Sequence, residues 1–173
     1  MEADERISHA DAAADAEINV AGWNELHTYL KNNRPLDEIK ALLGKSPDLA
    51  KGQTLLTKET PLLIGLESGA DPEAILLVLA AHPAATSVAE TGHWRIPLHS
   101  AAMNNYTLQV VEALYNAYPD GIQAKTIYDH TVLHMAVRNT KQVDTILFLF
   151  EKSPEQARVR NNTGETPLHV AMR

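Results

Sequence analysis

Short apolar stretches recur along the chain, with apolar side chains at the three- and four-residue spacing that is typical of one buried face of a helix. Four such stretches cover residues 36–43, 74–81, 110–115 and 143–150. A proline follows each of them, and these prolines are 36, 36 and 35 residues apart: Pro47, Pro83, Pro119 and Pro154. Since proline does not continue a helix, the pattern predicts four equivalent helices that end at equivalent points.

A second motif recurs with the same period. Its copies are Thr60-Pro61-Leu62-Leu63, Ile96-Pro97-Leu98-His99, Thr131-Val132-Leu133-His134 and Thr166-Pro167-Leu168-His169, and Leu26-His27 is a weaker first copy. The leucines are 36, 36, 35 and 35 residues apart. Proline is favoured in the first turn of a helix, so the motif predicts a helix start in each copy.

The third copy predicts the structure of one unit. A first helix over 97–103 is followed by Asn104 and Asn105, which tolerate left-handed backbone and interrupt it. A second helix is expected over 108–117, after which Pro119-Asp120-Gly121 turns the chain into a connecting segment, 122–129. A helix pair of this size cannot bury its apolar face alone. The sequence therefore predicts a mainly α fold, a helical solenoid of stacked helix-turn-helix units.

The string Thr166-Pro167-Leu168-His169-Val170-Ala171 resembles the ankyrin repeat, and the resemblance covers residues 21–173 as about four repeats and a truncated fifth. It implies antiparallel helix pairs, hairpin loops that project sideways, and a concave binding surface. It also implies that threonine and histidine tie each hairpin to its helix, here Thr131 with His134 and Thr166 with His169.

The sequence departs from the family pattern in three respects. The period is 35 or 36 residues rather than the usual 33. The glycine between the helices is kept at Gly69 but replaced by Asn32-Asn33, Asn104-Asn105 and Asn139-Thr140. The first copy is degenerate, with Trp23 before Leu26-His27, which suits a capping unit. We also expect the native polypeptide to continue beyond Arg173, which lies within the first helix of the fifth unit.

Composition and charge exclude or disfavour several classes of site and function. Cysteine is absent, which excludes disulfides and thiol-based sites. Residues 1–20 form an acidic, alanine-rich leader, expected to be a flexible tail or a capping helix. The other residues carry no basic stripe, which disfavours nucleic-acid binding. No apolar run is long enough for membrane insertion, and the N-terminus lacks a secretory signal, so a cytoplasmic or nuclear location is expected.

The sequence gives little support for a catalytic or metal site. The recurring His27, His99, His134 and His169 are expected to be structural, because packed helices lie about 10 Å apart and cannot share a metal. His130 lies four residues before His134, but the helix is expected to begin only near Thr131, which leaves His130 in a loop. No nucleophile elbow or phosphate loop occurs. We expect no metal, no cofactor and no catalytic residue.

The expected function is that of a protein-interaction module or scaffold, since exposed loops on a rigid array concentrate binding residues. The candidate contacts are His93, Trp94, Arg95, Tyr128, Asp129 and His130 in the hairpins, and Ser100, Met103, Met135 and Arg138 on the inner helices. An alternative for Trp94 and Tyr128 is packing against neighbouring hairpins. An alternative for the whole array is a regulatory or substrate-docking arm of a larger enzyme with a catalytic domain beyond Arg173. The sequence specifies neither the partner nor an oligomeric state.

Overall fold

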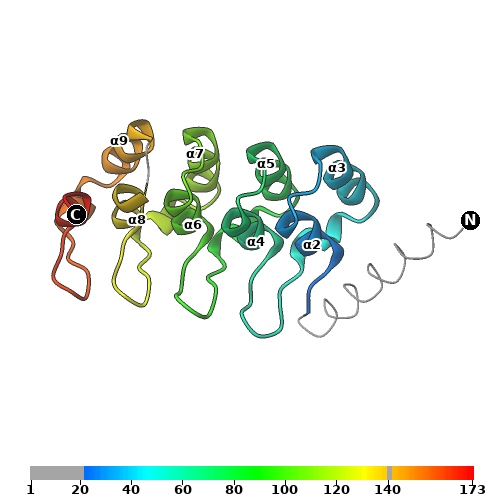
Figure 1. Cartoon of the computed structure of the whole chain (residues 1–173), viewed down its shortest axis with the longest axis horizontal. Helices are drawn as coiled ribbons and strands as arrows, with labels where there is room; N and C mark the ends of the chain where they lie inside the picture. Colours follow the sequence, from blue (N-terminus) through cyan, green and yellow to red (C-terminus); the bar gives the residue numbers. More distant parts are fainter. Residues whose placement is uncertain (1–21, 140–141) are drawn as a thin grey trace, which may run out of the picture.

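The computed structural model describes residues 22–139 and 142–173, in which helix pairs stack side by side in sequence order (Figure 1). The leader expected over residues 1–20 lies outside the described residues. The inner row of helices is α2 (Glu25–Lys31), α4 (Pro61–Ser68), α6 (Pro97–Met103), α8 (Val132–Asn139) and α10 (Pro167–Ala171). The outer row is α3 (Leu36–Lys45), α5 (Pro72–Ala81), α7 (Leu108–Ala117) and α9 (Val143–Lys152). This arrangement confirms the predicted helical solenoid.

The inner helices begin where the repeated motif predicted. Helices α4, α6 and α10 start at the proline of the motif. The Thr60 hydroxyl caps α4 by accepting the Leu63 N–H at 3.3 Å, which satisfies one of the free donors of the first turn. Helix α8 begins at Val132, so His130 lies in the preceding loop, as predicted.

Left-handed residues turn the chain between the two helices of a unit. The φ angle is 52° at Asn33, 73° at Gly69 and 60° at Asn105. Asparagine adopts this conformation more easily than most residues because its short polar side chain bonds locally. These turns confirm that asparagine replaces the glycine of the family pattern in two units; the third expected replacement, Asn139-Thr140, lies partly outside the described residues.

The segments after the outer helices differ from the prediction. Each begins with a 3₁₀ helix instead of a turn and an irregular connection: η1 (Pro47–Lys51), η2 (Pro83–Ser87), η3 (Pro119–Gln123) and η4 (Pro154–Arg158). The residue before each proline has non-helical backbone, with Tyr118 at φ −148° and ψ 78°. Proline disfavours helical backbone in the residue before it, while its own fixed φ suits a 3₁₀ turn. The proline therefore ends one helix and starts the next.

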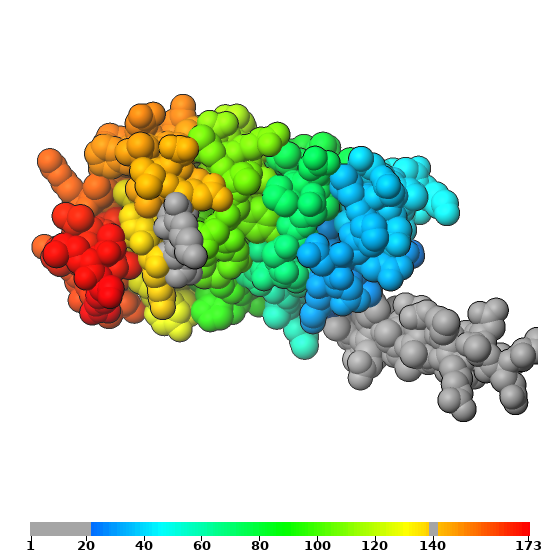
Figure 2. Space-filling model, turned by 45° about the horizontal axis from the view of Figure 1, so that its top comes forward, coloured from blue at the N-terminus to red at the C-terminus, as the bar shows by residue number. Residues whose placement is uncertain are grey.

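A single apolar core runs through the array, so that each unit is stabilised by its neighbours. Figure 2 shows successive units as bands in direct contact. Small residues bring the helices close: a Cβ at Gly65 would lie 2.8 Å from the Ile75 side chain. The Tyr106 hydroxyl donates to the carbonyls of Gly65 at 3.1 Å and Ala70 at 2.8 Å, which joins the third unit to the second. In the part of the chain that the structure describes, no helix combines the length and apolar character needed to cross a membrane.

Candidate functional site

Hairpin loops project in one direction from the inner row of helices (Figure 1), and a buried polar residue organises each of the four in the described residues. The second hairpin shows the principle. The Glu90 carboxylate is 4% exposed and accepts the backbone N–H groups of Gly92 at 2.5 Å, His93 at 2.7 Å and Arg95 at 3.3 Å. Burial acts to raise the pKa of Glu90, but these hydrogen bonds outweigh it and the pKa lies below its ordinary value. Glu90 is therefore ionised at neutral pH.

Equivalent residues organise the other hairpins. Thr54 accepts from the Glu59 N–H at 2.9 Å, and Thr126 accepts from the Tyr128 N–H at 3.3 Å and the His130 N–H at 3.2 Å. In the fourth hairpin, Asn161 accepts the N–H groups of residues 163 and 165 at 3.1 and 2.9 Å. Sequence reasoning missed these residues, although Thr54, Glu90, Thr126 and Asn161 are 36, 36 and 35 residues apart.

Neighbouring hairpins are joined by backbone hydrogen bonds near their tips. The Thr91 N–H donates to the Thr57 carbonyl at 3.0 Å, the Ile127 N–H to the His93 carbonyl at 3.0 Å, and the Asn162 N–H to the carbonyl of residue 128 at 3.1 Å. Within the third hairpin, Lys125 and Thr131 form an isolated antiparallel bridge. The hairpins therefore form a continuous edge in which each loop is supported by the previous one.

One position of every hairpin has left-handed backbone. Its φ is 59° at Lys58, 60° at Trp94, 58° at Asp129 and 81° at Gly164. Glycine is the residue for which this conformation costs least, and aspartate is among the residues that tolerate it. A large aromatic residue is rare in this region of backbone space. The Trp94 side chain is nevertheless 60% exposed, so it is not held in place by burial in the core.

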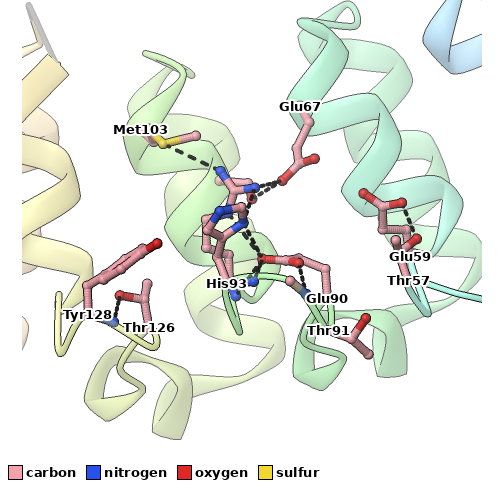
Figure 3. A network of polar contacts seen from close by, with 12 residues as sticks. Thr57, Glu59, Glu67, Glu90, Thr91, His93, Met103, Thr126 and Tyr128 are labelled. Atoms are coloured by element: carbon pink, nitrogen blue, oxygen red, sulfur yellow. Dashed lines mark hydrogen bonds and ion pairs between the residues drawn. The ribbon is translucent and has the colours of Figure 1, made fainter.

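Arg95 connects the second hairpin to the inner helices through a polar cluster. Figure 3 labels its partners Glu67, Glu90, His93 and Met103. Its guanidinium contacts the Glu67 carboxylate at 3.0 Å and the Glu90 carboxylate at 3.3 Å. It also contacts the Met103 sulfur at 3.7 Å and His93 Nδ1 at 3.5 Å. Burial raises the pKa of Glu67, and the Arg95 charge opposes the increase. The predicted residues His93, Arg95 and Met103 thus share one cluster, together with two glutamates that the sequence analysis did not select.

Exposed apolar side chains gather at the tips of three adjacent hairpins, and we call them the tip row. Its members are Leu55 at 61%, Leu56 at 84%, Trp94 at 60%, Ile127 at 40% and Tyr128 at 45% exposure. The hairpin segments that carry them, 52–60, 88–96 and 124–131, each contain one basic and one acidic residue. The tip row is therefore apolar and carries no net charge, in a chain with a formal charge of −7.

The recurring histidines mostly tie hairpins to helices, as the resemblance implied. His134 Nδ1 contacts the Thr131 hydroxyl at 2.9 Å and its Nε2 contacts the Glu165 carbonyl of the next hairpin at 3.1 Å. His169 Nδ1 contacts the Thr166 hydroxyl at 2.7 Å. His99 differs: its ring is fully buried, and neither nitrogen has a hydrogen-bond partner among the described residues. The threonine three residues earlier is replaced there by Ile96, which has no hydroxyl to offer.

Two of the predicted site residues are buried, which corrects their expected position on the concave face. Ser100 is 0% and Met135 is 6% exposed, because both lie on the sides of inner helices that pack against neighbouring helices. The Ser100 hydroxyl donates to Glu67 at 3.4 Å. Arg138 is exposed, as is Asp129, whose carboxylate lies 3.9 Å from Lys125 Nζ.

His130 is half-buried and its ring lies 5.6 Å from that of His134. The pKa values of both histidines are lowered, mainly by burial. Within residues 22–139 and 142–173, no three histidine, aspartate or glutamate side chains gather in a way that could hold a metal ion.

Comparisons with known proteins agree with this geometry. The family described as ankyrin repeats, in three copies, matches residues 98–173. Among solved structures, the chain is similar to a chain in the complex of a predatory endopeptidase from Bdellovibrio bacteriovorus with an immunity protein. That match has a TM-score of 0.72 and 22% identity, and covers 88% of this chain and 75% of the other. A comparison with curated proteins finds no match. The helix pairs, the hairpin edge and the three repeats matched over residues 98–173 support the resemblance to ankyrin repeats.

Proposed function

We propose that this chain is a protein-interaction module that binds a partner protein through its hairpin tips and the adjoining concave face. The proposed contacts are His93, Trp94, Arg95, Tyr128, Asp129, His130, Met103 and Arg138, and the tip row adds Leu55, Leu56 and Ile127. Ankyrin-repeat proteins are generally interaction modules without catalytic activity, which supports a binding function rather than an enzymatic one.

The observation that carries the proposal is the backbone conformation of Trp94. Left-handed backbone costs about 1–2 kcal/mol for a residue with a side chain, and the equivalent residue of the fourth hairpin is Gly164. An exposed tryptophan at such a position contributes less to folding than a buried one. Strain of this kind is found at functional sites, where the surrounding structure maintains it. Tryptophan is also among the residues most often found to dominate binding energy at protein interfaces.

Hydrogen bonds beneath the tip row hold its side chains on an ordered backbone. Glu90 fixes the hairpin of Trp94 from inside, and the Ile127–His93 hydrogen bond joins this hairpin to that of Tyr128. A surface that is already ordered loses little conformational entropy when a partner binds, so preorganisation increases affinity. The similar chain from Bdellovibrio bacteriovorus belongs to a structure of two proteins in complex, which is compatible with a protein partner here.

Affinity capture from the native source, with the full chain as bait, tests this proposal. We expect one stoichiometric partner, retained by the wild type and lost by the double variant Trp94→Gly, Tyr128→Ala. Lys58→Gly is the matched control, since Lys58 occupies the same left-handed position on the first hairpin. Equal capture by the wild type and the double variant, with the fold of both intact, would contradict the proposal.

A further inference from the structure

A cleft of about 520 Å³ lies between the third and fourth hairpins and the inner helices α8 and α10. It is lined by polar and charged side chains, with Tyr128 at the junction with the tip row. The residues that determine its chemistry are Tyr128, His130, Arg138, Asn161, Glu165 and Arg173.

Asn161 determines which nitrogen of His130 carries the proton. Its side-chain oxygen accepts two backbone N–H groups of its own hairpin, so the other amide atom is the NH₂ group. That group lies 2.9 Å from His130 Nε2 and donates to it. His130 Nε2 is therefore the acceptor, and a neutral His130 carries its proton on Nδ1. Burial, followed by the nearby Arg138 charge, lowers the pKa of His130, which keeps the ring neutral at pH 7.

Arg138 supplies an uncompensated positive charge. Glu165 is the carboxylate that lines the cleft, and the Arg173 guanidinium pairs with it at 2.5 Å. Among the described residues, no acidic side chain pairs with Arg138. With His130 and His134 both neutral, the lining carries two arginines against one glutamate, a net charge of +1. Such a cleft suits a singly charged anion rather than a phosphate dianion, and a planar guanidinium matches a carboxylate in two parallel hydrogen bonds.

We propose that this cleft binds the side-chain carboxylate of an aspartate or glutamate of the partner protein. The Arg138 guanidinium forms the ion pair, and two other lining residues, His130 and Tyr128, each carry one further donor, the Nδ1–H and the hydroxyl. Because Tyr128 belongs to both the cleft and the tip row, the recognised segment carries an acidic residue beside an apolar one. A chain that passes along the hairpin tips presents side chains to the cleft, which favours a side-chain carboxylate over a chain terminus. This inference rests on the proposed function.

Nuclear magnetic resonance with the ¹⁵N-labelled full chain tests the cleft without the partner. The probe is N-acetyl-glutamate with its α-carboxyl group blocked as the amide, and the neutral control is N-acetyl-glutamine amide. We expect saturable shifts of the amides of residues 128 to 130 and of the Arg138 side chain with the charged probe alone. Arg138→Gln is expected to weaken binding at least tenfold, because charge-assisted hydrogen bonds are lost. Arg158→Gln removes the same charge from an exposed residue outside the lining and is expected to leave binding unchanged.

Three results would overturn the inference. The first is equal shifts with the neutral probe, and the second is equal weakening of binding by Arg138→Gln and Arg158→Gln. The third is tighter binding of N-acetyl-glutamine, whose α-carboxylate is free, than of the blocked glutamate probe. The capture experiment separates this failure from that of the proposed function. Loss of the partner on Trp94→Gly, Tyr128→Ala but not on Arg138→Gln would reject the cleft and retain the interaction module.

Discussion

Protonation of His99 is expected to destabilise the fold between pH 7 and pH 5. The ring is fully buried and neither nitrogen has a hydrogen-bond partner in the described part of the chain. Burial lowers the pKa of His99 from 6.5 to about 4, although the nearby carbonyls of Ala124 and His130, neither in hydrogen-bond geometry, oppose the effect. The unfolded chain therefore binds the proton more tightly than the folded one. The stabilising effect is complete above pH 6.5 and is lost as the pH falls toward 4.

The size of the effect follows from the two pKa values. With an unfolded value near 6.5 and a folded value of about 4, the linkage relation gives a loss of about 2 kcal/mol at pH 5 and about 3 kcal/mol below pH 4. A loss of about 2 kcal/mol is a large fraction of the stability of a small domain. Moderate acidification alone should therefore shift the unfolding transition measurably.

Urea unfolding at pH 7 and pH 5 measures this contribution in the wild type and in His99→Gln, which carries no titratable group at that position. His27 and His134, whose pKa values are also lowered by burial, titrate in both proteins and cancel in the comparison. The wild type should lose about 2 kcal/mol more than the variant between the two pH values. Equal losses would show that His99 remains neutral or finds a partner when protonated, which would contradict the expected destabilisation.

Four further substitutions test the packing and the hairpins by urea unfolding and amide exchange. Tyr106→Phe removes the donor to the carbonyls of Gly65 and Ala70, of which the Gly65 carbonyl still accepts the Ala70 N–H, and should cost about 1–3 kcal/mol; no loss would mean that water replaces the hydroxyl. Gly65→Ala should cost about 1–3 kcal/mol by overpacking, because the new methyl would meet Ile75 at 2.8 Å. Gly44→Ala, with nothing within 4 Å, should instead gain up to about 1 kcal/mol from helix propensity. Glu90→Ala should accelerate amide exchange in residues 91–95 and at Ile127, whose N–H donates to the His93 carbonyl. It should leave residues 128–130 protected, because their N–H groups bond within their own hairpin; uniform acceleration would contradict a local role.

The positions of the helices could be predicted because proline and the repeated motif act locally. The predicted ranges 97–103 and 108–117 coincide with α6 and α7. The 3₁₀ helices were not predicted, since a proline after a helix is compatible with several turn geometries and neighbouring units select among them. Their recurrence after all four outer helices indicates that the longer period accommodates this turn.

The candidate site could be predicted only in part. The positions of the hairpin tips could be predicted from the repeat. The four buried polar residues that organise the hairpins could not, because they share a hydrogen-bonding role rather than a residue type: Thr54, Glu90, Thr126 and Asn161. Glu67 lies 28 residues from Arg95, and its place beside Arg95 depends on how successive units stack. The burial of Ser100 and Met135 depends on the rotation of the inner helices, which the sequence pattern did not determine.

The unfolding free energy of Trp94→Gly tests most directly whether Trp94 serves binding or hairpin packing. Glycine at this position relieves about 1–2 kcal/mol of backbone strain. It also costs about 0.5–1 kcal/mol, because glycine has greater conformational freedom in the unfolded chain. The loss of the contacts of the exposed indole with the hairpin surface offsets the net gain that is left. We expect a stability within about 1 kcal/mol of the wild type. A loss of more than about 3 kcal/mol, the size typical of truncating a buried aromatic residue, would show that Trp94 is a packing residue of the hairpins and would contradict its proposed role in binding.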